Sequence, residues 1–77
     1  MENILKILSG LRPEFNFAES SDFIADGYLD SFDIVALISE LEGTFHVLID
    51  GMDVLPENFC SLEAIAATVR KNGGTLD

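Results

Sequence analysis

Asp26-Gly-Tyr-Leu-Asp-Ser-Phe-Asp33 is the stretch around which this 77-residue chain is organised. Its Asp-Gly pair is typical of a turn, and an amphipathic helix follows at once. Asp30 is a preferred N-cap residue, and Asp33, three positions later, is the shorter analogue of a capping-box acid. Both carboxylates lie at the positive end of the helix dipole, where negative charge is stabilising. We therefore predict a helix that begins at Ser31, with the Ser31 hydroxyl exposed at the tip of the molecule.

Apolar residues continue from this start at the spacing of one helix face. The predicted core stripe of helix 31–45 consists of Ile34, Leu37, Ile38, Leu41 and Phe45. Phe32 does not belong to it, because at about 100° per residue this ring lies nearly opposite Ile34. Its position beside Ser31 makes Phe32 a candidate contact for a partner protein.

Two further segments have the same apolar period. The first helix is predicted over 3–11, with the stripe Ile4, Ile7, Leu8 and Leu11. The last helix is expected after the N-cap Ser61, with the stripe Leu62, Ile65, Ala66 and Val69. Pro56 favours a short helical turn over 56–59 that places Phe59 in the core.

Long connections separate these helices, and apolar residues are expected to anchor them. In the loop 13–29 the candidate anchors are Phe15, Phe17, Phe23, Ile24 and Leu29. A short helical turn is considered for 20–24, and an extended loop 46–55 is expected to be anchored by Leu48 or Ile49. The predicted fold class is all-α, with one domain over 1–77. It is expected to be a small four-helix bundle with three main helices and one short helix, and a long loop between the first and second helices. A frayed tail is expected near 73–77.

Charge is the most informative bulk property. Fourteen acidic and four basic residues give a net charge of −10, and no Lys or Arg lies between Pro13 and Val69. Phosphate binding requires basic groups, so nucleic acid and anionic membranes are poor partners, whereas a basic protein surface is a natural one. No apolar run reaches the roughly 20 residues of a membrane span, and no signal peptide is recognised. These features are typical of a cytoplasmic protein without stable membrane insertion.

The residues required for catalysis are sparse. His46 is the single histidine, and it lies beyond the far end of the predicted helix, roughly 20 Å from Ser31 at 1.5 Å per residue. A Ser-His-Asp arrangement therefore fails on distance. The single cysteine, Cys60, is expected to be a small buried residue, and no cluster has the composition of a zinc site. We predict that the chain is not an enzyme and holds no metal.

A calcium-binding loop is an alternative function for the same stretch. Asp22–Asp33 spans twelve residues, with Asp22 at position 1 and Asp26 at position 5 of an EF-hand-like loop. Ile24 at position 3 cannot coordinate a cation, and position 12 holds Asp33 rather than a bidentate glutamate. These departures weaken the calcium hypothesis without removing a weak divalent-ion site.

Asp30-Ser31-Phe32-Asp33 resembles the attachment motif of the acyl carrier protein family, with Phe32 in the usual Leu or Met position. The resemblance covers nearly the whole chain: a short first helix, a long loop, the second helix, Glu57-Asn58-Phe59 and the last helix. The form of 26–32 looks most like the D-alanyl carrier proteins and other discrete carriers related to peptide-synthetase carrier domains.

The resemblance implies that Ser31 receives 4′-phosphopantetheine from coenzyme A through a phosphopantetheinyl transferase with Mg²⁺. The thiol of this group would carry an acyl or aminoacyl cargo as a thioester, in lipid or secondary metabolite biosynthesis. An acyl or aminoacyl ligase would load it, and acyltransferases or synthases with basic docking surfaces would use it, the carrier being a monomer. The implied recognition residues are Asp30, Phe32, Asp33, Glu40 and Glu42 on the second helix, with Glu57 near the third.

Two positions depart from the family's pattern. Ala36 stands where fatty acid carriers commonly have an acid, and His46-Val47 stands where Gly-Ile is frequent. A third hypothesis is an unmodified adaptor that uses the Phe32 face to bind a basic partner.

Overall fold

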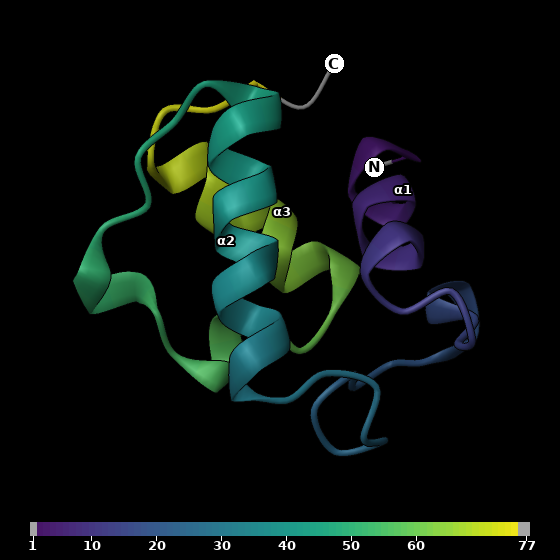
Figure 1. Ribbon diagram of the computed structural model, residues 1–77. Coiled ribbons are helices and arrows are strands. Elements are labelled where there is room, and N and C mark those ends of the chain that lie inside the picture. Colours follow the sequence, from purple (N-terminus) through teal and green to yellow (C-terminus); the bar gives the residue numbers. More distant parts are fainter. Residues whose placement is uncertain (1, 76–77) are drawn as a thin grey trace.

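The computed structural model describes residues 2–75. Within them the chain forms three α-helices joined by loops that contain single 3-10 turns, and no strand (Figure 1). The helices are α1 (Glu2–Leu11), α2 (Ser31–Phe45) and α3 (Leu62–Lys71), and the 3-10 turns are η1 (Phe17–Glu19), η2 (Gly51–Asp53) and η3 (Pro56–Asn58). The predicted all-helical class with three main helices is confirmed, and the short turn expected after Pro56 is η3. None of the helices in this part of the chain is long and apolar enough to cross a membrane.

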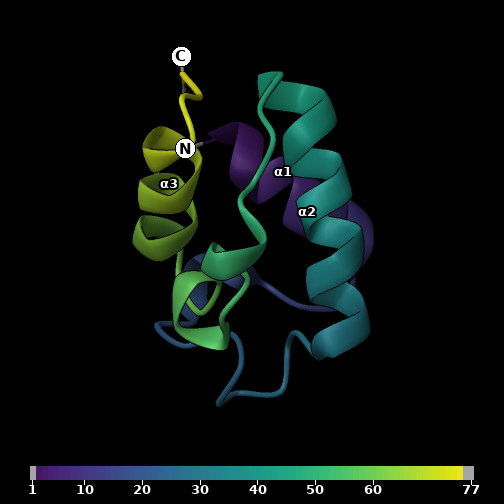
Figure 2. The same cartoon turned by 90° about the vertical axis from the view of Figure 1, so that its left-hand side faces the viewer.

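The connection after α2 determines what surrounds the start of that helix. In both views the chain leaves the C-terminal end of α2, returns past η2 and reaches η3 near the N-terminal end of α2 (Figures 1 and 2). The chain then enters α3, which lies alongside α1 on the other side of the core (Figure 2). Ser31 and η3, far apart in sequence, therefore lie at the same end of the molecule.

The predicted stripes form the core, but only their central residues are fully covered. Each helix buries a short row: Ile4 and Leu8 of α1; Ile34, Leu37 and Leu41 of α2; Ile65, Ala66 and Val69 of α3. The stripe residues at the edges of these rows are half-buried against the same core: Ile7, Leu11, Ile38, Phe45 and Leu62. Three helices of 10 to 15 residues cannot surround one another completely, so the flanks of each stripe stay partly exposed.

Aromatic side chains fix the long first loop, as predicted. Phe17, Phe23 and Leu29 are buried, and Phe15 stacks on Tyr28 with ring centroids 4.4 Å apart. The helical turn considered for 20–24 is present slightly later, as a single turn in which the N–H of Asp26 donates to the carbonyl of Asp22 at 3.0 Å. The 3-10 turn η1 is separate and precedes it, and the Asn16 side chain caps η1 by accepting a hydrogen bond from the N–H of Ala18. This loop is therefore an ordered wall of the domain.

Ile49, and not Leu48, anchors the second loop. Val47 and Ile49 are buried, whereas Leu48 is 83% exposed, since alternate residues of an extended segment point to opposite sides. The carboxylate of Glu42 also accepts a hydrogen bond from the N–H of Ile49 at 3.0 Å. The prediction of an anchor at Leu48 or Ile49 is confirmed with Ile49 as the anchor, and Val47 is a second anchor that the prediction did not name.

The chain after α3 folds back on the helix instead of fraying at once. The N–H groups of Gly73 and Gly74 donate to the carbonyls of Arg70 and Val69, at 3.0 and 2.9 Å. Gly73 has a φ of 93°, a left-handed conformation in which glycine ends a helix without strain. Of the predicted frayed tail, residues 76 and 77 lie outside the described part of the chain.

Candidate functional site

The start of α2 has the capping geometry that its sequence predicts. The side chain of Asp30 accepts a hydrogen bond from the N–H of Asp33 at 3.0 Å, and the Asp33 carboxylate accepts one from the N–H of Asp30 at 3.1 Å. Ser31, the first helical residue, is exposed, and no group within residues 2–75 takes its hydroxyl as a hydrogen-bond partner. The cap therefore leaves the Ser31 hydroxyl available.

Replacing Asp30 by alanine is expected to destabilise the domain by about 1 kcal/mol, because the first-turn N–H groups lose their acceptor. Urea unfolding followed by circular dichroism measures the loss. Asp30→Asn is the control, since asparagine caps helices about as well as aspartate. An equal loss in the two variants would show that the cap does not stabilise this helix.

Arg12, the first residue after α1, brings a positive charge to this helix start. Its Nε lies 3.1 and 3.0 Å from the two carboxylate oxygens of Asp33, and its Nη2 lies 3.8 Å from Asp30. Glu14 is a further partner at 3.5 Å. Burial acts to raise the pKa of Asp33, but the Arg12 guanidinium and the N–H of Asp30 outweigh it and hold this pKa below 3.8. Arg12 thus ties the end of α1 to the start of α2.

The Arg12→Gln variant is expected to lose part of the acid dependence of stability. In the native chain, Asp33 stabilises the fold fully above its ordinary pKa of 3.8, and this contribution disappears as the pH falls toward its lower folded value. In the variant the pKa of Asp33 moves back toward its ordinary value. The difference in free energy of unfolding between the native and variant chains is therefore largest above about pH 5 and becomes smaller toward about pH 3. Urea unfolding at both pH values measures the gap. Arg70→Gln removes the same charge far from Asp33, and a gap that narrows equally in this control would contradict the assignment.

A shallow apolar groove begins at Ser31. Its volume is about 240 Å³, and it is lined by Ser31, Ile34, Val35, Val54, Leu55 and Pro56. One wall belongs to the first turns of α2, and the other is the segment between η2 and η3. Val35 is 66% exposed and Leu55 is 44% exposed, so accessible apolar surface lies beside the Ser31 hydroxyl. This groove can cover the apolar part of a group attached to Ser31.

Two of the six predicted recognition residues flank Ser31 and are free to meet a partner. Phe32 is 86% exposed, as expected for a ring opposite the core stripe. Asp30 keeps 61% of its side chain exposed although it caps the helix. Asp33 differs, because only 14% of its side chain is exposed and Arg12 covers its carboxylate.

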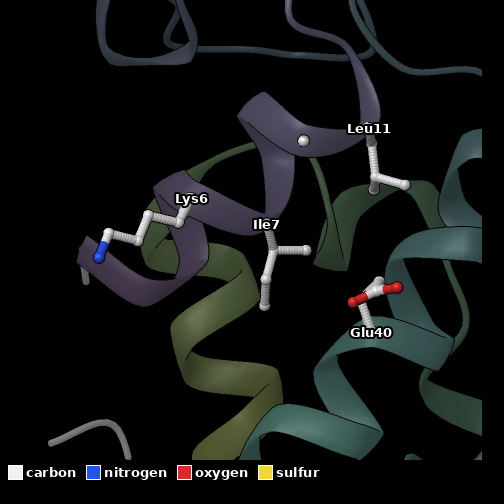
Figure 3. A pocket seen from close by; sticks show the side chains of 5 residues that line it. Lys6, Ile7, Leu11 and Glu40 are labelled. Atoms are coloured by element: carbon white, nitrogen blue, oxygen red, sulfur yellow. The ribbon is translucent and has the colours of Figure 1, made fainter.

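Of the other three predicted recognition residues, Glu40 and Glu42 lie further along α2, whereas Glu57 belongs to η3 at the same end of the molecule as Ser31. Glu40 lines a separate groove of about 330 Å³ between α1 and α2, which Lys6, Ile7, Gly10 and Leu11 also line (Figure 3). Glu42 is half-buried and bound to the N–H of Ile49. Glu57 is exposed beside a hollow that Cys60 also lines, and Cys60 is half-buried rather than fully buried as expected. The acidic residues predicted for partner recognition therefore lie on several faces of the molecule.

Sequence reasoning missed the groove walls. Val35 lies off the core stripe just as Phe32 does, and the same criterion of helical phase would have identified it. Val54 and Leu55 directly precede Pro56, and no local pattern indicates that they face α2. The ion pair of Arg12 with Asp33 joins residues 21 positions apart, which sequence spacing does not predict.

In the described residues, the side chains needed for Ser-His-Asp catalysis or for metal binding do not come together in one site. His46 ends α2 with a φ of 55°, so the whole helix separates it from Ser31. The aspartates of the calcium hypothesis have separate partners: Asp22 accepts from the N–H groups of Ile24 and Ala25, and Asp26 accepts from the Ser20 hydroxyl at 2.6 Å. Residues 2–75 contain no group of three or more His, Cys, Asp or Glu placed to hold a metal ion.

Comparison of the chain with models of protein families, with curated proteins and with solved structures finds no match.

Proposed function

We propose that this chain is an acyl or aminoacyl carrier protein with the small helical bundle of the acyl-carrier type, and that Ser31 carries 4′-phosphopantetheine. The observation that supports this most is the Ser31 hydroxyl, which is exposed at the first position of α2 and beside an apolar groove, while Asp30 caps the helix. When attached, the group supplies a thiol that holds the cargo as a thioester. The chain itself catalyses no reaction in this role.

The residues around Ser31 fit such a group. The N–H groups of the first turn of α2 favour a phosphate ester beside them. Val35, Val54 and Leu55 offer apolar surface along which the uncharged part of the arm can lie. The exposed Asp30 carboxylate can help to bridge, through Mg²⁺, to the pyrophosphate of coenzyme A on a phosphopantetheinyl transferase.

The cargo is best accommodated at the surface. Ile34 lines the groove, and Leu37 and Leu41, which follow it along the core stripe, have no exposed surface. Protein cores are close-packed, so a long acyl chain would have to displace these side chains. A small acyl or aminoacyl group beside the groove requires no such change.

Partner enzymes are expected to dock on the exposed start of α2. Phe32 supplies an apolar contact there, and the net charge of −10 favours ligases, acyltransferases or synthases with basic docking surfaces. Two of the four basic residues, Arg12 and Lys71, already pair with acids of the chain itself. Their pairing leaves much of the surface acidic for electrostatic steering.

The test is incubation of the native chain with coenzyme A, Mg²⁺ and a promiscuous phosphopantetheinyl transferase. The expected result is a mass gain of one phosphopantetheine, located by fragmentation on the peptide that contains Ser31. A known carrier in the same tube shows that the transferase is active. No gain on this chain beside a fully modified control would rule out the proposed function.

A further inference from the structure

Asp53 is one of two buried polar residues in the described chain, and it lies next to the groove wall. It is 6% exposed and is the last residue of η2. A buried carboxylate is costly unless charged or hydrogen-bonding groups surround it. Its partners therefore show what the residue holds in place.

Both oxygens of the Asp53 carboxylate bind the C-terminal end of α3. Oδ1 accepts from the Lys71 ammonium at 2.6 Å, and Oδ2 accepts from the Asn72 amide at 3.2 Å. The Asn72 side chain also accepts from the N–H of Asp50 at 3.0 Å. The hydrogen bond from Lys71 lowers the pKa of Asp53, against the opposing effect of burial. The loop is thus bound to α3 by two neighbouring residues.

The main chain of Asp53 continues this connection into the groove wall. Its carbonyl accepts hydrogen bonds from the N–H of Leu55 at 2.9 Å and from the Asn58 side chain at 2.7 Å. Asn58 is in turn held by α3, because its carbonyl accepts from the Thr68 hydroxyl at 3.3 Å. Leu55 lines the groove opposite the helix that carries Ser31. One residue therefore connects the end of α3 to the wall that faces the site.

We propose that Asp53 is a positioning residue for the site at Ser31: its carboxylate fixes the loop to Lys71 and Asn72, and its carbonyl holds Leu55 in the groove wall. Without the Lys71 ammonium, the carboxylate is left with Asn72 alone and turns toward water. The segment that contains Leu55 then moves away from α2, and the groove widens. The effect on modification rests on the proposed function of Ser31, whereas the effect on the loop does not.

The test compares Lys71→Gln with Arg70→Gln by amide hydrogen exchange in the native state. Each variant removes one positive charge from the last turn of α3, but Arg70 has no ion pair within residues 2–75. The Lys71 side chain is 69% exposed, so its loss does not open the core. In Lys71→Gln the N–H of Leu55 is expected to exchange about tenfold faster, while the core N–H of Leu41 is unchanged. Lys71→Arg, which keeps a charged donor, should restore the native rate.

Transfer of phosphopantetheine to the same chains separates this inference from the proposed function. For Lys71→Gln we expect the KM of the phosphopantetheinyl transferase for the carrier to rise about threefold while its kcat is unchanged. For Arg70→Gln we expect both constants to keep their native values. Equal exchange of Leu55 in the native, Lys71→Gln and Arg70→Gln chains would overturn the role of Asp53, even if Ser31 is modified. Faster exchange of Leu55 in Lys71→Gln alone supports the role of Asp53. If the native chain then gains no phosphopantetheine, the proposed function of Ser31 is wrong, but the proposed role of Asp53 in holding the loop is still supported.

Discussion

The Ser31→Ala chain is expected to gain no phosphopantetheine under conditions that modify the native chain completely. The change removes the one atom, the hydroxyl oxygen, to which the phosphate can be attached. Stability should stay within about 0.5 kcal/mol of the native value, because Ser31 is exposed and Asp30 provides the cap. Intact mass and urea unfolding of the same sample measure both quantities.

Ser39→Ala is the matched control for this loss. Ser39 is an exposed serine on the same helix, eight residues beyond Ser31, and its replacement should leave the mass gain intact. A gain that persists in Ser31→Ala would place the attachment elsewhere. The adaptor hypothesis, which the 86% exposure of Phe32 favours, predicts instead that a basic partner binds Ser31→Ala and native chains equally well.

The Leu37→Ala chain is expected to lose about 2–5 kcal/mol of stability. Leu37 has no exposed surface and lies in the middle of the buried row of α2, so its truncation leaves a cavity that the short helices cannot close. A domain of this length has a total stability of about 4–12 kcal/mol, so the variant would lose a large share of it. The shift of the urea midpoint measures the loss.

Val35→Ala is the companion variant on the same helix. Val35 is 66% exposed, and its truncation should change stability by no more than about 0.5 kcal/mol. Similar losses in the two variants would show that the core does not lie on the Leu37 face of α2. The comparison tests the orientation of the helix on which the position of Ser31 depends.

Local sequence signals predicted the three helices and the start of α2. The capping box joins residues three positions apart, and the apolar stripes repeat every three or four residues, so each is decided within one or two helical turns. The same phase argument correctly placed Phe32 outside the core. Where an extended segment allowed two registers, as at Leu48 and Ile49, the sequence could not decide between them, because either residue could have faced the core.

The sequence by itself therefore determined where the α-helices lie, how α2 is capped and why Ser31 is left with a free hydroxyl. Only the tertiary structure decided what surrounds that hydroxyl. The Arg12–Asp33 pair and the groove wall at Leu55 come from segments about 20 positions away from the start of α2. The Asp53–Lys71 connection joins residues 18 positions apart. Such contacts depend on how the loops return across the core, a consequence of packing the whole chain that no short stretch of sequence encodes.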